Sequence, residues 1–447
     1  MNQILILGAG RSSGSLINYL LQQAKLFKWQ ITVGDFSEAA AIERLGQDPA
    51  GKAIRFDIND DLASRPAIAA ADVIISVLPA HYHIMVARYC LMLRKHLLTA
   101  SYVTDEMMSL HDEARQNNLL FMNECGLDPG IDHMSAMQVI DQIKSRNGKL
   151  VSFESFTGGL IAPETDPQNP WRYKFTWNPR NVVMAGQSTA RFLQEGEFKY
   201  IPYQQLFSRT TNVTVEGIEY EGYANRDSLK YLDTYGLSGI QTMLRGTLRN
   251  KGFCSAWNIL VQLGCCDDQL VMENVSQLTH RTFLDSFLDF HPHASVSEKI
   301  ITKFKLEPHG EEIRRLSWSG LFSNERVDLK LGTPAQVLEH ILSKKWKLSP
   351  GEKDFVVMWH RFVFEQDGMK KEIQAHLTAT GENEIETAMS RAVGLPLGIV
   401  ASLLLQGKIA SRGVVIPVMR EVYDPVLKAL GKLGISLQER ETGQVIS

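Results

Sequence analysis

The sequence predicts an α/β protein: an N-terminal doubly wound parallel sheet, followed by a second domain of α+β type that carries a mostly helical insertion. Three observations lead to this prediction. The first third of the chain alternates short apolar strands with helices, a glycine-rich turn follows the first strand, and the alternation ends soon after residue 132. Strands separated by helices form parallel sheets covered on both faces, and the doubly wound sheet is their commonest fold.

The N-terminal domain is predicted from a regular series of short apolar runs. The expected strands cover residues 4–7, 31–34, 53–56, 73–77, 96–99 and 119–122. The expected helices between them include residues 13–23, 82–92 and 106–117. This pattern predicts a dinucleotide-binding domain of the Rossmann type at residues 1–126, which the C-terminal segment 385–447 is expected to join. Within that segment, Asp424 and Pro425 are the expected cap and first residue of a closing helix.

The second domain is predicted at residues 127–384, where strands and helices no longer alternate. A strand is expected at residues 149–153, and residues 225–350 are largely helical by the spacing of their apolar side chains. Two further strands flank Gln366-Asp367-Gly368, in which Asp-Gly suits a tight hairpin turn. The expectation is a domain for substrate binding and dimerisation, with a helical subdomain around residues 250–350.

The composition is that of a globular protein with two or three domains. A chain of 447 residues exceeds the size of one hydrophobic core, and its net charge of -3 gives it no attraction for nucleic acid. Its five cysteines form no Cys-x-x-Cys pair, so no metal site or disulfide framework is expected. The apolar stretch 393–405 contains Pro396 and is too short to span a membrane. No basic region precedes the apolar run 4–7, which argues against a signal peptide and for a cytoplasmic protein.

A glycine-rich turn at residues 8–14 joins the first strand to the first helix. Gly8 allows the tight turn, Gly10 lets the backbone approach a pyrophosphate, and Ser13 replaces the third glycine of the dinucleotide fingerprint with a small residue. The helix N-terminus adds free N–H donors and a partial positive charge, which suit a nicotinamide dinucleotide. The predicted cofactor contacts in this turn are Gly8, Gly10, Arg11, Ser12 and Ser13.

Asp35 ends the second strand, where an acidic residue accepts hydrogen bonds from the adenosine ribose. A 2'-phosphate there would meet a like charge, so Asp35 favours NAD over NADP, although Arg11 lies close enough to weaken this preference. The alternative for Asp35 is a strand-end residue that only starts a turn. Val77 and Leu78 follow another strand at the sheet edge where ligands bind, and they are predicted to line the cofactor.

The loop at residues 123–133 follows the last strand of the predicted sheet and contains five ionisable side chains. Asp128-Pro129-Gly130 predicts a tight turn, in which glycine takes a positive φ. Asp132 is expected to cap a helix that His133 then enters. Two interpretations stay open for this loop: a functional site, or a turn and a cap without chemistry.

Together these motifs resemble the saccharopine dehydrogenase (glutamate-forming) family, also called saccharopine reductase. The resemblance covers essentially the whole chain, and many matches in order are more specific than a glycine turn alone. Besides the glycine turn and the loop at 123–133, its carriers are Thr99-Ala100-Ser101-Tyr102-Val103, Gly158-Gly159-Leu160, Ala162-Pro163-Glu164, Tyr173-Lys174-Phe175-Thr176-Trp177, Asn225-Arg226-Asp227-Ser228, Arg245-Gly246-Thr247-Leu248-Arg249 and Arg391-Ala392-Val393-Gly394-Leu395-Pro396.

The resemblance implies an NAD(P)-dependent enzyme of lysine metabolism that interconverts saccharopine with glutamate and 2-aminoadipate 6-semialdehyde. A homodimer is expected. The substrate contacts implied are Ser101, Tyr102, Asp128, Arg226, Thr247 and Arg249, and the further cofactor contacts are Leu127 and Pro129. Asp128 is the expected proton-handling group and Tyr102 the second catalytic residue. By residue type alone, the alternatives for proton transfer are Glu124, His81, His83 and His133.

Saccharopine carries three carboxylates and a secondary amine, so its site needs fixed cations. Arg226, Arg245 and Arg249 qualify because a guanidinium binds a carboxylate bidentately, although a surface ion pair is the commoner fate of a single arginine. Lys174 and Arg180 are weaker candidates.

Two positions depart from the family pattern. Gly34-Asp35-Phe36 stands where NADP-using members tend to carry a basic residue, which bears on the choice of cofactor. Asn178-Pro179-Arg180 stands where a serine pair is commoner, which bears on one substrate or cofactor contact. Two other functions stay open, because a fold alone does not fix a function. They are an amine dehydrogenase of the carboxynorspermidine or opine-like type, and a non-catalytic nucleotide-binding sensor.

Overall fold

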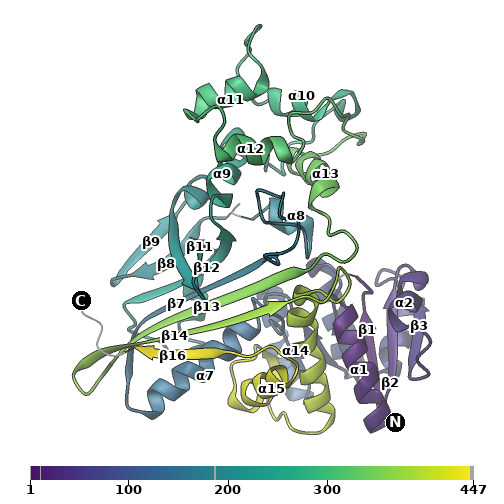
Figure 1. Cartoon of the computed structure of the whole chain (residues 1–447). Coiled ribbons are helices and arrows are strands. Elements are labelled where there is room, and N and C mark those ends of the chain that lie inside the picture. The colour runs from purple at the N-terminus through teal and green to yellow at the C-terminus, as the bar shows by residue number, and fades with distance from the viewer. Residues whose placement is uncertain (1, 11, 186–187, 443–447) are drawn as a thin grey trace. The chain divides into compact units, whose positions relative to one another are not determined.

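The computed structural model describes residues 2–10, 12–185 and 188–442, and the chain forms two compact units (Figure 1). The first unit contains Met1–Lys149 and Leu377–Gln438, and the second contains Leu150–His376 and Glu439–Ser447. The first unit therefore extends beyond the expected boundary at residue 126. The reason is the helix α7 (Ile131–Ser145), which packs against α15 (Arg420–Lys432) of the same unit.

The first unit is built on a seven-stranded parallel sheet, as predicted. Its strand order is β15-β6-β5-β4-β1-β2-β3. The order of connection reverses at the β1–β4 pair: the chain runs from β1 outward to β3, and then from β4 outward to the other edge. Strands buried on both faces are apolar throughout, and β4 is buried at every position. The strands are β1 (Gln3–Leu7), β2 (Gln30–Asp35), β3 (Gly51–Arg55), β4 (Val73–Ser76), β5 (His96–Thr99), β6 (Leu120–Met122) and β15 (Gly413–Val415).

Helices cover this sheet, and two that are distant in sequence lie side by side in Figure 1: α1 (Gly14–Phe27) and α14 (Ala388–Leu405). Glycines make this approach close, because a Cβ on Gly398 would lie 2.7 Å from the Tyr19 ring. The other helices of this unit are α2 (Glu38–Leu45), α3 (Asp61–Ala70), α4 (His83–Leu93), α5 (Asp105–Met108), α6 (His111–Gln116), α7 and α15, with a 3-10 turn, η1 (Ala80–Tyr82). The C-terminal segment thus supplies the strand β15 and the two helices α14 and α15 to the first unit.

Two helix boundaries in the first unit differ from the predictions. The closing helix α15 starts at Arg420, so Asp424 and Pro425 lie inside it rather than at its beginning. Its buried residues Val422 and Tyr423 precede the proline, and their packing favours an earlier start. The expected helix at 106–117 is divided into α5 and α6.

By length and composition, α14 is the one helix of the described residues that could cross a membrane. Of this 18-residue stretch, 78% is buried inside the structure. Burial of this extent is usual for the core helix of a globular fold, which passes the same test.

The second unit is built on a mixed nine-stranded sheet with the order β10-β11-β12-β7-β13-β14-β16, to which the β8-β9 hairpin is attached through β12. The predicted hairpin is present, and Asp367 and Gly368 at its turn have φ values of 53° and 74°. The strands are β7 (Lys149–Ile161), β8 (Ala190–Gln194), β9 (Glu197–Ile201), β10 (Thr210–Val215), β11 (Ile218–Ala224), β12 (Thr242–Asn250), β13 (Asp354–Gln366), β14 (Met369–Thr380) and β16 (Gln438–Thr442).

Helices fill much of the second unit between β12 and β13, as expected for residues 250–350. The wider prediction of helix from residue 225 was wrong, because residues 242–250 form β12, which pairs with β11 and β7. The helices are α8 (Pro179–Val183), α9 (Phe253–Leu263), α10 (His280–Asp285), α11 (Val296–Phe304), α12 (Glu311–Trp318) and α13 (Pro334–Trp346), with 3-10 turns at Tyr203–Ser208, Ser228–Tyr231 and Val275–Gln277. Their core is aromatic, with Trp171, Trp257 and Trp346 all within one cluster.

Candidate functional site

The glycine-rich turn lies where the strand order of the first unit reverses, which is the usual position for a dinucleotide. Gly8 has a φ of 107°, and a Cβ there would lie 3.1 Å from the Val77 carbonyl oxygen. The Gly8 N–H donates to the Gly34 carbonyl at 2.8 Å. Only glycine therefore fits between the ends of β1 and β4.

The same turn leaves room for a pyrophosphate. A Cβ on Gly10 would meet no atom within 4 Å, and the Ser13 hydroxyl donates to the Gly10 carbonyl at 2.8 Å. Helix α1 has no side-chain cap and no acidic residue in its first turn. In this first turn, the Ser15 N–H donates to Ser390 Oγ at 3.3 Å. A helix N-terminus attracts anions, so the turn, with Ser12, stays the predicted cofactor site. Arg11 lies outside the described residues.

Asp35 connects the end of β2 to the glycine turn. Its Oδ2 accepts a hydrogen bond from the Ala9 N–H at 2.7 Å, and its Oδ1 accepts one from the Ser37 N–H at 2.9 Å. Part of its hydrogen-bonding capacity is therefore used by the protein itself. A cation also lies at this edge: Arg55 is paired with Asp35 in the sheet register, and its guanidinium lies 5.4 Å from the centre of the Phe36 ring. Arg55 was not among the predicted site residues, although a basic residue at the end of the strand next to β2 indicates a candidate cofactor contact.

Val77 and Leu78 follow β4 and are half-buried. The Val77 N–H donates to the Leu7 carbonyl at 2.9 Å, which fixes this backbone beside the glycine turn. The predicted contacts Leu127 and Pro129 are buried in the loop after β6. They therefore support that loop from inside.

The loop at residues 123–133 forms the predicted tight turn, and its Asp128–Pro129 peptide bond is cis. Gly130 has a φ of 148°, and a Cβ there would overlap the Gly126 backbone at 2.1 Å. Asp128 is half-buried, whereas the other residues of this loop are buried. A rigid, buried turn thus presents the Asp128 carboxylate.

Asp132 does not cap the following helix, contrary to the prediction. Helix α7 begins at Ile131 after Gly130, which places Asp132 in the first helical turn. Its Oδ1 accepts a hydrogen bond from the Gly130 N–H at 2.6 Å, so the carboxylate still stabilises the helix entry.

Glu124 and His133 form a buried pair in which Glu124 Oε2 lies 2.9 Å from His133 Nε2. The other carboxylate oxygen of Glu124 accepts a hydrogen bond from the Val103 N–H at 2.9 Å, and its backbone N–H donates to the Ser101 carbonyl at 3.0 Å. Both side chains are almost fully buried, at 1% and 0% exposed. The pair is therefore shielded from solvent and holds the segment at residues 101–103 in place.

His83, at the start of α4, contacts three hydroxyl groups. Its Nδ1 lies 2.9 Å from Ser76 Oγ, and its Nε2 lies 2.8 Å from Ser101 Oγ and 3.2 Å from Thr99 Oγ1. Burial, with a further effect of the charge on His81, lowers the pKa of His83 to about 4. From the sequence, His83 was predicted only as one of several alternatives for proton transfer. Ser101 and Tyr102, both half-buried, follow β5 at the same sheet edge.

In the second unit, Arg245, Thr247 and Arg249 alternate along β12 and so share one face of the sheet. The Arg249 guanidinium lies 5.1 Å from the centre of the Tyr173 ring, 5.9 Å from that of Tyr223 and 5.3 Å from that of Phe253. Its Nη1 donates to the Leu248 carbonyl, but its buried Nε has no hydrogen-bond partner. Within the part of the chain that the structure describes, no carboxylate pairs with Arg249.

Arg226 is held near β12 through its neighbour Asn225, whose N–H donates to the Arg245 carbonyl at 2.9 Å. Arg226 is exposed and has a left-handed backbone with a φ of 50°. The Arg245 guanidinium is buried and lies 4.5 Å from the centre of the Tyr231 ring. The three arginines predicted to bind carboxylates thus belong to one region of the second unit.

The two weaker cationic candidates are held in structural ion pairs. Lys174 Nζ contacts Glu352 at 2.6 Å and Asp166 at 2.9 Å. Arg180 pairs with Asp268, while the neighbouring Asn178 caps α8 through the Arg180 N–H. Residues 178–180, which differ from the family pattern, therefore cap a helix and form an ion pair within the second unit.

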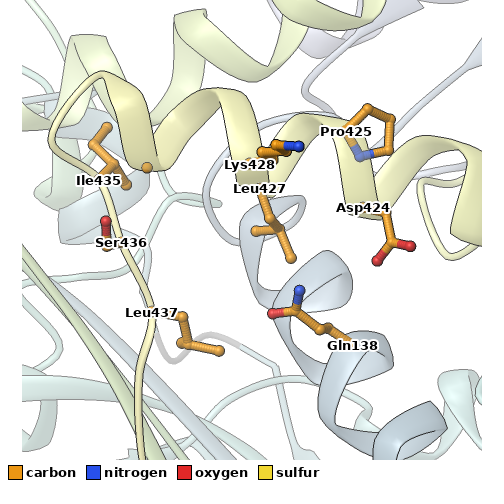
Figure 2. Close-up of a pocket in the computed structure, with 9 residues that line it drawn as sticks. Gln138, Asp424, Pro425, Leu427, Lys428, Ile435, Ser436 and Leu437 are labelled. Atoms are coloured by element: carbon orange, nitrogen blue, oxygen red, sulfur yellow. The ribbon is translucent and has the colours of Figure 1, made fainter.

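A surface hollow on the first unit lies apart from the predicted site residues. Figure 2 shows Gln138 on α7 opposite Leu427 and Lys428 on α15. The complete lining is Gln138, Asp424, Pro425, Leu427, Lys428, Gly431, Ile435, Ser436 and Leu437. Among the described residues, no group of three or more histidine, cysteine or acidic side chains is arranged to hold a metal ion.

Comparison with known proteins identifies the family. The family model described as "Saccharopine dehydrogenase NADP binding domain" matches residues 4–122, and the one described as "Saccharopine dehydrogenase C-terminal domain" matches residues 126–435. The chain belongs to the saccharopine dehydrogenase family. This finding confirms the resemblance noted in the sequence.

Individual relatives in this family match over most of the chain. The saccharopine dehydrogenase [NADP(+), L-glutamate-forming] of Schizosaccharomyces pombe is 32% identical over 98% of this chain and 99% of its own length. The mitochondrial alpha-aminoadipic semialdehyde synthase of mouse is 31% identical over 98% of this chain, but only 48% of that relative is covered. The solved structure of apo saccharopine dehydrogenase (L-Glu forming) from Saccharomyces cerevisiae has a TM-score of 0.88 and 30% identity, over 99% of this chain and 100% of that one. The predicted fold class is thereby confirmed.

Proposed function

We propose that this chain is a saccharopine dehydrogenase of the glutamate-forming type, an NAD(P)-dependent oxidoreductase of lysine metabolism. The names of its relatives support this proposal. The observation that carries it is Arg249, a buried guanidinium that has no carboxylate partner among the described residues. Burying a charge without a counter-charge costs free energy, so we expect an anionic substrate to supply the counter-charge of Arg249.

Saccharopine supplies carboxylates for several cations. We propose that Arg249 binds one of them by a charge-assisted, bidentate interaction, and that Arg226 and Thr247 contribute further contacts. The aromatic rings around Arg249 hold its guanidinium in a fixed orientation. Because the guanidinium is oriented before substrate binds, little conformational entropy is lost on binding.

Asp128 is the proposed proton-handling group, and Tyr102 is the proposed second catalytic residue. When bound, an oxidised nicotinamide would accept a hydride from the carbon that becomes the aldehyde carbon of the semialdehyde. Oxidation leaves an imine, which water hydrolyses to glutamate and 2-aminoadipate 6-semialdehyde. The amine loses its proton in the oxidation, and a carboxylate held on the rigid turn at Gly130 is suited to accept it.

For the cofactor, we propose that the chain accepts NADP, in agreement with the names of its relatives, in place of the NAD preference expected from Asp35. The support is Arg55, whose positive charge offsets that of Asp35 at the adenosine-ribose end of the turn. The two backbone hydrogen bonds that Asp35 accepts also reduce its repulsion of a phosphate. Arg55→Ala should raise the KM for NADP about tenfold and leave that for NAD nearly unchanged. Equal changes for both cofactors would contradict this role.

The proposed function is tested by incubating the purified protein with saccharopine and NADP, and then with NAD, while the absorbance of the reduced cofactor is followed. Reduction that depends on saccharopine is the expected result. No reduction with either cofactor, together with turnover of carboxynorspermidine, would favour the rival amine dehydrogenase. Binding of a cofactor without turnover of either amine would favour the sensor. The homodimer and the cytoplasmic location stay predictions, to be checked by analytical ultracentrifugation and by cell fractionation.

A further inference from the structure

We propose that His83 is a positioning residue, which fixes the Ser101 hydroxyl as a hydrogen-bond acceptor for an N–H group of the amine substrate. This inference rests on the proposed function, since it concerns the same substrate. Its basis is the hydrogen-bonded series of Ser76, His83 and Ser101, here called the imidazole bridge, at the ends of β4 and β5.

The imidazole bridge reaches from the interior of the first unit to a partly accessible hydroxyl. Ser76 and His83 are buried, at 0% and 4% exposed, whereas Ser101 is half-buried. The backbone of Ser101 is already fixed, because its carbonyl accepts a hydrogen bond from the Glu124 N–H and its own N–H donates to Thr99 Oγ1. What remains to be set is the direction of the Ser101 hydroxyl, and His83 contacts it at 2.8 Å.

This positioning role requires one tautomer of His83, because both ring nitrogens contact hydroxyl groups. In this tautomer, Nδ1–H donates to Ser76 Oγ at 2.9 Å, and Nε2 holds the one acceptor lone pair of the ring. Of the two hydroxyls near Nε2, Ser101 Oγ is the closer at 2.8 Å, whereas Thr99 Oγ1 lies 3.2 Å away and accepts the Ser101 N–H. The Ser101 hydroxyl donates to Nε2, which leaves its oxygen lone pairs for an incoming N–H group.

This arrangement requires a neutral imidazole, because a protonated ring has no acceptor nitrogen. Burial keeps His83 neutral, with its pKa lowered to about 4. A cation in this position would also repel a protonated amine. The bridge therefore suits a substrate with an N–H donor, and an amine or ammonium group has this chemistry.

Two substitutions of His83 separate its two hydrogen bonds. The asparagine amide of His83→Asn reaches the position of Nδ1, whereas the glutamine amide of His83→Gln reaches that of Nε2. We expect His83→Asn to lower kcat/KM for saccharopine by about tenfold or more, and His83→Gln by less than about threefold. The matched control is His96→Asn, at the opposite end of β5, where His96 Nδ1 accepts the Leu120 N–H at 3.0 Å. That variant should retain the wild-type kcat/KM.

The decisive measurement repeats His83→Asn in a Ser101→Ala background. If His83 acts through Ser101, its substitution costs nothing further once the hydroxyl is gone. The same loss of kcat/KM in both backgrounds would overturn the proposal and indicate a structural role. Thermal unfolding and the KM for the cofactor, measured for every variant, identify any loss that arises from misfolding.

A second measurement needs no substrate. Nitrogen-15 NMR of the imidazole rings should show His83 as the neutral Nδ1–H tautomer near neutral pH, with its signal assigned by its loss in His83→Asn. The Nε2 signal should move in Ser101→Ala. The opposite tautomer, or an unchanged Nε2 signal, would refute the imidazole bridge. If the wild type does not oxidise saccharopine, the proposed function fails, and the NMR result still decides the geometry of His83.

Discussion

A buried ion pair in the first unit and a buried arginine in the second unit differ in how the protein satisfies their charges. In the first unit, Glu124 pairs with His133 at 2.9 Å, and the protein satisfies both groups itself. In the second unit, Arg249 is buried to a similar degree, yet aromatic rings and one backbone carbonyl are its described contacts. The satisfied pair holds structure, whereas Arg249, which has no counter-charge among the described residues, is the group proposed to bind an anionic ligand.

Replacing Arg249 tests this contrast most strongly. We expect Arg249→Met to lower kcat/KM for saccharopine by about a thousandfold, roughly 4 kcal/mol, because a charge-assisted carboxylate contact is lost. The melting temperature should not fall, since the substitution removes a buried charge that has no partner.

Arg315→Met is the matched control for Arg249. Arg315 is also buried, but its Nε and Nη2 donate to the carbonyls of Pro170 and Lys251 at 3.0 and 3.2 Å. Its loss should destabilise the fold by about 2 kcal/mol in urea unfolding. The contrast breaks down if Arg249→Met unfolds as easily as Arg315→Met and keeps its kcat/KM.

Glu124→Gln tests the satisfied pair. Loss of the carboxylate charge beside His133 should lower the free energy of unfolding by about 3 kcal/mol. The comparison variant is Glu106→Gln, which breaks the exposed ion pair of Glu106 with Arg88 and should cost less than about 1 kcal/mol. Equal effects of the two variants in urea unfolding would show that burial of the Glu124 pair has no energetic consequence.

The pH dependence of stability gives the smallest effect. The pKa of His83 is about 4 in the folded protein and about 6.5 when unfolded, so the unfolded chain binds the extra proton as the pH falls. Between about pH 7 and pH 5, His83 should therefore reduce the free energy of unfolding by about 2 kcal/mol. His83→Gln should flatten this part of the curve, and an unchanged slope would exclude His83 as its source.

The sequence was sufficient for features that depend on local pattern. The strands of the first unit, the glycine turn and the turn at Gly130 follow from runs of apolar residues and from positions where only glycine fits. The partners of ionisable side chains could not be predicted in this way. Arg249 lies among Tyr173, Tyr223 and Phe253, which three separate segments supply.

Two further features depended on pairing that a linear pattern does not contain. Glu124 contacts His133 across the turn, and its backbone has a φ of 53°, which is uncommon for a residue other than glycine. Strand β12 was included in the region 225–350, which the spacing of apolar side chains in its later segments indicated as helical. Its place is set by its pairing with β7 and β11.

The close packing of α14 on α1 has a consequence for how the protein is made on the ribosome. Leu16 and Tyr19 emerge early in synthesis, but Gly394 and Gly398, which cover them, are added more than 370 residues later. The strand β15, at the edge of the same sheet, follows later still. An apolar face of α1 therefore stays uncovered until nearly the whole chain has been translated.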